Sequence, residues 1–242
     1  MSPGGIWAVV PAKSLGEAKQ RLAGVLTAAE RQDLVRAMLG DVLAALAAVP
    51  DLAGILVVTR DAELAAIGRS FGAHVMTDLR HEGPTSAVTM AATWLAAEGA
   101  AGMIAIPADV PLVTPDEIGQ ILATMGEPPA MTLVPALADM GSNAVALAPP
   151  DAIPLRFGLR SFFLHQEAAL ERGIAPHILR LPGLGLDVDR PDDLAAFVAE
   201  PSATRSYACL AERSLIERLR ETRPAAPVHD PGSGRASGKD GP

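Results

Sequence analysis

The stretch GMIAIPADVPLVTPDEI, residues 102–118, carries the pattern that decides the fold of this chain. Its apolar run from Gly102 to Ile106 predicts a buried strand, and Asp109 is the first charged residue after it. Residues 114–117, TPDE, then predict a helix start, with a threonine cap, proline in the first turn and acidic side chains near the helix N-terminus. A buried strand followed closely by a capped helix is the repeating unit of α/β proteins.

The same unit recurs along the chain. Strands are expected at residues 6–10, 54–59, 73–76, 102–106, 130–134, 144–147 and 177–181. Helices are expected at 27–48, 61–71, 84–98, from 114, at 161–172 and from 190. We therefore expect an α/β fold, a single Rossmann-like domain over residues 1–200 with a mostly parallel, doubly wound sheet. Residues 201–220 can add one helix between Tyr207 and Leu219, and 221–242, rich in Pro, Gly and Ser, are expected to form a disordered tail.

The composition excludes several classes of protein. The formal net charge of -8 and an aromatic content of 3% argue against nucleic-acid binding, which needs a basic face or stacking side chains. Cys209 is the single cysteine, so neither an internal disulfide nor a cysteine-held zinc is expected. No stretch has the length and apolarity of a membrane span, and the first ten residues do not resemble a signal peptide. We expect a soluble, cytoplasmic protein.

A basic loop follows the first expected strand. Lys13, Lys19 and Arg21 place three positive charges beside a strand end of an acidic protein, as polyphosphate binding requires. A solvated basic surface loop is the alternative. The loop lacks both the GxGxxG dinucleotide pattern and the GxxxxGK[ST] phosphate loop, which argues against dehydrogenases and P-loop enzymes.

Three carboxylates are candidates for a magnesium site. Asp109 follows an apolar strand at the ligand edge of the expected sheet, although it could merely shape a turn. Asp187 and Asp189 alternate on an extended segment and should point to one side of it. Helix capping by Asp189 is the alternative, because Arg190 and Pro191 begin the last expected helix.

Small polar residues suggest an anion site elsewhere. Ser142 and Asn143 follow Gly141, while Gly158 precedes Ser161 at the start of an expected helix, where an anion is favoured. Two turns and an ordinary helix cap are the alternative. His165 on that helix is interpreted as a core or surface histidine, with orientation of a substrate as the second interpretation.

Several motifs in one order resemble the guanylyltransferases of coenzyme F-420 biosynthesis, over about residues 6–198. The opening VVPAKSLGEAKQRL is similar to the VPVKxxxxAKSRL pattern of that family. The resemblance continues through VVTRD (57–61), IPADVPLVTPDEI (106–118), GSNAVAL (141–147), RFGLRSFFLH (156–165) and LPGLGLDVDRPDDL (181–194). It implies a Rossmann-like nucleotidyltransferase that transfers GMP from GTP to a small phosphorylated three-carbon acid and releases pyrophosphate, with magnesium as cofactor.

The resemblance also implies roles for individual residues. Catalytic roles fall to Lys13, Lys19, Arg21 and Asp109, and metal binding to Asp109, Asp187 and Asp189. Nucleotide contacts fall to Pro11, Lys13, Thr59, Gly83 and Thr85. The acid would be held by Ser142, Asn143, Gly158 and Ser161. A downstream transferase of the same pathway would accept the product, no membrane or nucleic-acid partner is implied, and a homodimer is left open.

Two departures from the family pattern bear on specificity. Thr85 stands where relatives commonly carry the asparagine of GLNxAL, which bears on the nucleoside contacts. Residues 139–144, DMGSNA, stand where the family often has GTGTNA, which bears on the choice among phosphoenolpyruvate, 2-phospholactate and 3-phosphoglycerate. Two alternatives stay open: a nucleotidyltransferase with another acceptor, such as the molybdenum cofactor or a sugar phosphate, and a non-catalytic nucleotide-binding protein.

Overall fold

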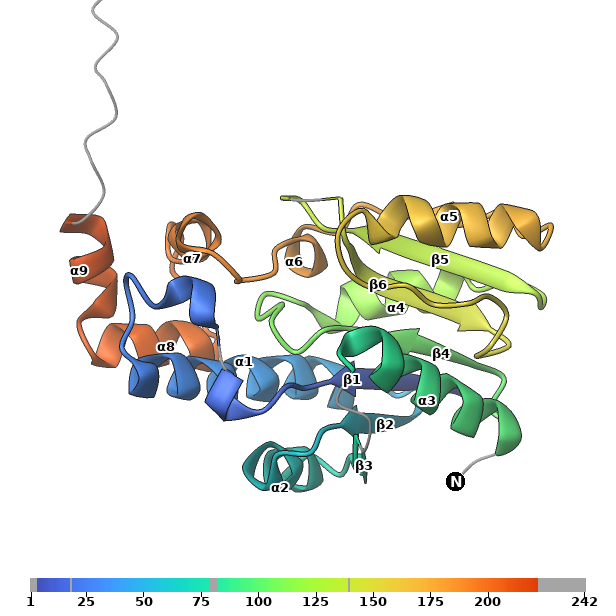
Figure 1. The fold of residues 1–242 in the computed structure, drawn as a ribbon, viewed down its shortest axis with the longest axis horizontal. Coiled ribbons are helices and arrows are strands. Elements are labelled where there is room, and N and C mark those ends of the chain that lie inside the picture. The colour runs from blue at the N-terminus through green and yellow to red at the C-terminus, as the bar shows by residue number, and fades with distance from the viewer. Residues whose placement is uncertain (1–3, 18, 79–81, 139, 222–242) are drawn as a thin grey trace, which may run out of the picture.

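A seven-stranded sheet runs through the computed structural model, which describes residues 4–17, 19–78, 82–138 and 140–221. The strand order is β3-β2-β1-β4-β6-β5-β7 (Figure 1). The strands are β1 (Ile6–Pro11), β2 (Leu52–Val58), β3 (His74–Met76), β4 (Gly102–Ala105), β5 (Ala130–Pro135), β6 (Ser142–Ala148) and β7 (His177–Ile178).

The pairing of these strands confirms a mostly parallel sheet. β1 pairs in parallel with both β2 and β4, β2 with β3, and β5 with β7. Among the described strands, only the pairs made by β6 are antiparallel, because β6 follows β5 in a hairpin and then lies against β4. One reversed strand therefore divides an otherwise parallel sheet.

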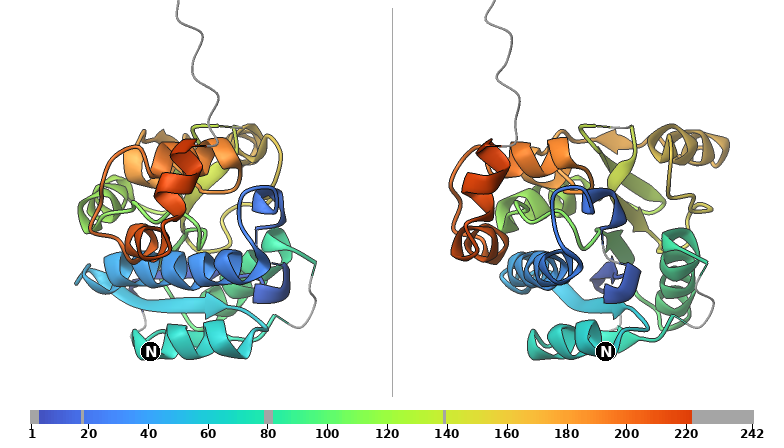
Figure 2. Two further views of the ribbon diagram at one scale, coloured as in Figure 1. Left: turned by 90° about the vertical axis from the view of Figure 1, so that its left-hand side faces the viewer. Right: turned by 60° about the vertical axis from the view of Figure 1, so that its left-hand side comes forward.

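Helices cover both faces of the sheet, as Figures 1 and 2 show. Ala8 and Val10 of β1 belong to a core cluster shared with α1 (Ala28–Ala47), α2 (Ala62–Ser70) and α4 (Pro115–Thr124). Trp7 and Val9 belong to the opposite cluster, shared with α3 (Pro84–Ala97) and α5 (Ser161–Glu171). Successive residues of a strand point to opposite faces, so a continuous apolar strand serves both layers.

The C-terminal part packs on α1 through a third apolar cluster. Its buried members include residues of α1 and of the short helices η2 (Gln20–Leu22), α7 (Pro191–Phe197), α8 (Arg205–Glu212) and α9 (Leu215–Glu221). Two other short helices, η1 (Leu15–Glu17) and α6 (Pro182–Gly185), contribute to the cluster that contains Ala8. Met38 of α1 contacts this cluster together with Phe197 and Leu210. Asp41 of α1 accepts hydrogen bonds from the backbone N–H groups of Arg205 and Ser206 and so holds the start of α8.

Two sequence-based boundaries need correction. The strand predicted over 177–181 is only two residues long, since it ends at Ile178, and the last predicted residue, Leu181, is the N-cap of helix α6. The single helix predicted between Tyr207 and Leu219 is two helices, separated at Ser214, whose backbone has a φ of 52°. The tail predicted over 221–242 lies, apart from Glu221 at the end of α9, outside the described residues.

The parallel pair β1 and β4 sets the position of the site. The chain leaves the carboxyl end of β1 toward α1 and the carboxyl end of β4 toward α4, and open α/β sheets bind ligands beyond such strand ends. Among the described residues, none of the helices combines the length and apolar character required to cross a bilayer.

Candidate active site

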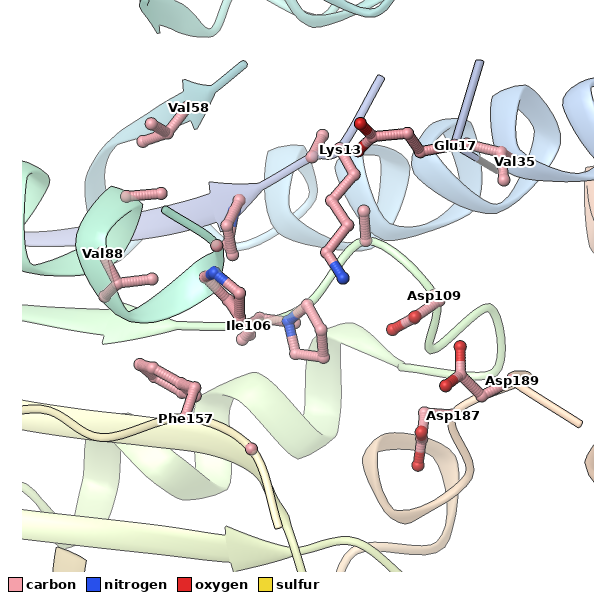
Figure 3. Close-up of a pocket in the computed structure, with 18 of the residues that line it drawn as sticks. Lys13, Glu17, Val35, Val58, Val88, Ile106, Asp109, Phe157, Asp187 and Asp189 are labelled. Atoms are coloured by element: carbon pink, nitrogen blue, oxygen red, sulfur yellow. The ribbon is translucent and has the colours of Figure 1, made fainter. Parts of the chain in front are cut away.

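A cavity of about 760 Å³ opens at the carboxyl ends of β1 and β4. Residues 11–14 after β1 line one part of it, and residues 106–109 after β4 line another. Figure 3 shows Asp109, Asp187 and Asp189 grouped on one side of this pocket, with the Lys13 side chain extending toward them. Phe157 lies on the opposite side. The pocket therefore has a charged wall, made by Lys13, Lys19, Arg21, Asp109, Asp187 and Asp189, and a neutral wall, made by Ser142, Gly158 and Ser161.

The basic loop is held in place by a carboxylate from the next strand. Asp61 follows β2 and caps α2, where it accepts hydrogen bonds from the N–H groups of Glu63 and Leu64. Its second oxygen accepts the N–H of Leu15 at 2.9 Å, which fixes the loop between β1 and α1. The loop then turns at Lys19, whose backbone is left-handed with a φ of 44°.

The loop turns so that Lys19 joins the two candidate metal-binding segments. Its ammonium group lies 2.5 Å from Asp109 Oδ2 and 2.7 Å from Asp189 Oδ1. Arg21 donates to the other oxygen of Asp189 at 2.8 Å. Burial by itself lowers the pKa of Lys19, but Asp109 and Asp189 outweigh burial and raise that pKa above its ordinary value. Burial likewise opposes ionisation of Asp189, yet the charge of Lys19 lowers the Asp189 pKa, so Lys19 and Asp189 both stay ionised at neutral pH.

Backbone and amide hydrogen bonds bring Asp187 and Asp189 to Asp109. The N–H of Val188 donates to the carbonyl oxygen of Asp109 at 2.9 Å. The side-chain amide of Asn143 donates to Asp187 Oδ1 at 3.1 Å and to the carbonyl oxygens of residues 184 and 185. Asn143 therefore positions the segment that carries Asp187, a role that the sequence did not predict for it.

The contacts of the two helix starts decide whether the carboxylates have a merely local role. Capping of the last helix by Asp189 is wrong, because Arg190 is the N-cap residue and the two Asp189 oxygens pair with Lys19 and Arg21. The prediction of a threonine cap at the start of α4 is confirmed, and Thr114 and Glu117 further exchange hydrogen bonds in a capping box. Other residues cap both helices, and the side chains of Asp109 and Asp189 line the pocket and bind Lys19 there.

The neutral wall contains no ionised group. Ser161 at the start of α5 is 1% exposed, and its Oγ accepts the N–H of Ser142 at 2.9 Å. Ser142 Oγ lies 2.9 Å from Nδ1 of His165, a residue with no solvent exposure. Burial lowers the pKa of His165 to about 4, so the ring is neutral at neutral pH. The interpretation of His165 as a core histidine is therefore supported, and the ring lies directly behind the wall.

The residues expected near the nucleoside divide into two groups. Pro11 and Gly83 line the pocket, and Gly83 has a φ of 90° that favours glycine. Thr59 is 2% exposed and its hydroxyl accepts the N–H of Asp61. The Thr85 hydroxyl accepts the N–H of Phe157 at 2.9 Å and donates to the carbonyl oxygen of the same residue at 3.3 Å. Thr85 therefore holds the loop that bears Gly158, and Thr59 holds the capping residue of α2.

The basic loop, the carboxylates and the serines of this pocket come from segments far apart in the sequence, between Pro11 and Arg190. Residues 6–222 match the family described as Guanylyl transferase CofC like. This chain belongs to that family. A phosphoenolpyruvate guanylyltransferase of Rubrobacter xylanophilus is 38% identical over 196 residues, which cover 80% of this chain and 94% of the relative. A 3-phospho-D-glycerate guanylyltransferase of Colwellia psychrerythraea is 34% identical over 77% of this chain and 88% of the relative.

Solved structures support the fold of this CofC-like chain. A protein described as a nucleotide-diphospho-sugar transferase from Desulfovibrio desulfuricans G20 superposes with a TM-score of 0.72 at 18% identity, covering 89% of this chain and 98% of the other. A nucleotidyl transferase from Methanothermobacter gives a TM-score of 0.57 at 18% identity, with 79% and 95% covered. At these identities the likeness establishes a nucleotidyltransferase fold.

The donor groups of the CofC-like site fit a hard cation, although they are not arranged around one. Carboxylate oxygens are the ligands that magnesium prefers. Within the described part of the chain, no group of three His, Cys, Asp or Glu side chains is placed to hold a metal ion. The cation between Asp109 and Asp189 is instead the ammonium group of Lys19. The position attracts positive charge, and a metal ion bound there would compete with Lys19.

Sequence reasoning missed two supporting residues of the site. Asp61 was expected as the end of the VVTRD motif and the start of a helix, yet it also fixes the basic loop through Leu15. Its position directly after β2, at the ligand edge of the sheet, was the available signal. Asn143 was expected to hold the acid and does line the pocket, and its amide nitrogen also holds the segment of Asp187. No pattern in the sequence predicts a contact between residues 44 positions apart.

Proposed function

We propose that this chain transfers GMP from GTP to the phosphate of a small three-carbon acid and releases pyrophosphate, as a step of coenzyme F-420 biosynthesis. The observation that carries the proposal is the division of one pocket into a charged wall and a neutral wall. A nucleoside triphosphate and a phosphorylated acid together carry several negatively charged phosphate groups and one carboxylate. The charged wall suits the phosphates, and the neutral wall suits the carboxylate.

Phosphoenolpyruvate is the first candidate for the acid, because the Rubrobacter relative is named for it and is 38% identical to this chain. The Colwellia relative, at 34% identity, makes 3-phosphoglycerate the second candidate. 2-Phospholactate is the third acid that the family resemblance allows. These acids differ beside the carboxylate, so the lining near Ser142 and Gly158 would decide among them.

The chemistry requires alignment more than activation. An oxygen of the acid's phosphate attacks the α-phosphorus of GTP, and the bond from that phosphorus to the β-phosphate oxygen breaks as pyrophosphate leaves. The attacking phosphate is already a nucleophile, so no covalent enzyme intermediate is needed. The protein has to hold two anions close together and to stabilise the charge that develops on the leaving group.

The residues of the charged wall perform that task in this proposal. Lys13, Lys19 and Arg21 would meet the triphosphate, with Lys19 leaving its carboxylates to do so. Pro11 and Gly83 would lie against the nucleoside. Ser142, Ser161 and the backbone at Gly158 would hold the carboxylate of the acid, so that its phosphate lies toward the charged wall.

Magnesium is the cofactor we propose, held by Asp109, Asp187 and Asp189. When bound, the metal would neutralise phosphate charge and orient phosphate oxygens. Support comes from the oxygen-only donor set and from the cation that two of these carboxylates already hold. Both substrates are metabolites of the cytoplasm, where we place the reaction, and a downstream transferase of the pathway would consume the product.

Pyrophosphate release tests this proposal. Purified protein is incubated with GTP and magnesium plus phosphoenolpyruvate, 3-phosphoglycerate or 2-phospholactate in turn, with ATP as the nucleotide control. We expect release with GTP and one acid, and none without an acid. Folded protein that releases pyrophosphate with none of the acids would contradict the proposal and favour another acceptor or a binding role.

A further inference from the structure

His165 lies directly behind the neutral wall and takes no part in the transfer described above. The ring has no solvent exposure, and both of its nitrogens have partners. Nδ1 lies 2.9 Å from Ser142 Oγ, and Nε2 accepts the backbone N–H of Arg156 at 3.0 Å. Phe157 packs against the ring edge-on, at 5.1 Å between centroids. One buried histidine thus connects β6, α5 and the loop that bears Gly158.

The hydrogen bond from Arg156 decides which ring nitrogen carries the hydrogen. A backbone N–H can only donate, so Nε2 must be the acceptor. A neutral imidazole has one N–H group, and burial keeps this ring neutral. The hydrogen is therefore on Nδ1, which donates to Ser142 Oγ.

This donation sets the direction of the Ser142 hydroxyl. Because its oxygen accepts from the ring, the hydroxyl hydrogen cannot point at His165 and is available to the pocket that Ser142 lines. Ser161 is in the same situation, since its oxygen accepts the N–H of Ser142. Two neighbouring hydroxyl groups then present hydrogens to the pocket, and such a pair favours a ligand group that only accepts hydrogen bonds.

We propose that His165 is a positioning residue that fixes Ser142 as a hydrogen-bond donor and thereby makes the neutral wall selective for the carboxylate of the acid substrate. This inference rests on the proposed guanylyl transfer and assigns one of its specificity determinants. A carboxylate is an acceptor with four lone-pair sites, whereas a hydroxyl or amide group in its place would bring a hydrogen of its own. The ring acts through Ser142 and has no contact with the substrate in this account.

Two substitutions separate this positioning role from simple packing. The amide nitrogen of asparagine reaches the place of Nδ1, so His165→Asn keeps a donor for Ser142 and loses the partner of the Arg156 N–H. Glutamine reaches the place of Nε2, so His165→Gln keeps an acceptor for Arg156 and loses the donor for Ser142. Both variants remove the ring that packs on Phe157, which makes each the control for the other.

The readout is the steady-state pyrophosphate assay with the acid and GTP varied separately. We expect His165→Gln to raise KM for the acid about tenfold, the loss of one hydrogen bond to a charged group, while KM for GTP stays unchanged. His165→Asn should restore most of the acid KM. Ser142→Ala should match His165→Gln, and the double variant should be no worse than either single variant, because both remove the same interaction.

Equal effects of the two His165 variants, or additive effects with Ser142→Ala, would overturn the positioning role while leaving guanylyl transfer established. Absence of transfer by the folded wild-type protein with every acid would overturn the proposed function and this inference with it. A second measurement needs no variant: nitrogen–proton NMR of the wild-type imidazole ring. A hydrogen on Nδ1 is expected, and a hydrogen on Nε2 would overturn the proposal even if His165→Gln fails to fold.

Discussion

The two walls of the pocket solve different problems with different physical means. The charged wall places Lys19, only 8% exposed, between two carboxylates that draw it away from any phosphate. The neutral wall places the Ser142 hydroxyl against a neutral histidine, and the hydroxyl oxygens of Ser142 and Ser161 each already accept a hydrogen bond from the protein. The charged wall must therefore exchange partners when substrates arrive, whereas the neutral wall is already arranged for a carboxylate. The comparison teaches that binding of the acid and alignment of the phosphates are separable.

The largest expected effect comes from removing a charge of the charged wall. Asp109→Asn should lower kcat by about 100-fold or more, because it removes a metal-binding carboxylate and a partner of Lys19. Steady-state pyrophosphate release measures the effect, and thermal melting checks that the variant is folded. Asp116→Asn is the matched control, since Asp116 is exposed and lies in the first turn of α4, the helix that follows Asp109. Near-normal turnover of a folded Asp109→Asn protein would remove Asp109 from the reaction.

Lys19→Met tests the charged wall through the stability of the protein. Without the ammonium group, Asp109 and Asp189 repel each other, and we expect the free energy of unfolding to fall by about 2 kcal/mol. Magnesium should then raise the melting temperature of Lys19→Met more than that of the wild type, because the metal no longer competes with lysine. Lys13→Met, at an exposed position of the same loop, is the control. An identical magnesium shift in all three proteins would show that the metal and Lys19 do not share a position.

A pH-dependent effect is expected from the neutral wall. The pKa of His165 is lowered to about 4 in the folded protein, so the unfolded chain binds more protons below the ordinary value of 6.5. Stability attributable to the neutral ring is complete above pH 6.5 and is lost as pH falls, by about 2 kcal/mol between pH 6.5 and 5.

Urea unfolding at several pH values measures that dependence. Subtracting the curve of His165→Gln removes the contribution of other titrating groups, including Asp189 and Lys19. The difference between wild type and variant should shrink with decreasing pH over this window. A difference that stays constant from pH 7 to 5 would contradict a buried, neutral His165.

The smallest expected effect comes from Thr85, which holds the loop of the neutral wall. Thr85→Val removes both hydrogen bonds to the Phe157 backbone and should lower the free energy of unfolding by about 1 kcal/mol. We also expect a raised KM for the acid, because the loop with Gly158 loses its attachment. Thr89→Val, at an exposed position of the same helix, serves as control. A raised KM for GTP alone would contradict this role and support the predicted contact of Thr85 with the nucleoside.

The positions of the site residues could be predicted from the sequence far better than their contacts. Strand ends alone place Lys13 and Asp109 at one edge of a parallel sheet, and β1 and β4 do lie side by side. The bridge from Lys19 to Asp109 and Asp189 spans 90 and 170 positions, and no local pattern encodes it. The same is true of Thr85, which is bonded to a residue 72 positions away instead of facing the pocket with its hydroxyl.

Element boundaries failed where local signals competed. The strand predicted over 177–181 stops after Ile178, and its last predicted residue, Leu181, is the N-cap of the helix that Pro182 begins. The helix predicted between Tyr207 and Leu219 breaks at Ser214, where no glycine or proline marks the turn.

Identification of the transfer product tests the central claim most directly. GTP, magnesium and each acid are incubated with the enzyme, and phosphorus NMR and mass spectrometry follow the products. The account predicts a phosphoanhydride that joins GMP to the phosphate of one acid, formed in equal amount to pyrophosphate and absent when ATP replaces GTP. Conversion of GTP to free guanosine phosphates at a rate independent of the acid would contradict it.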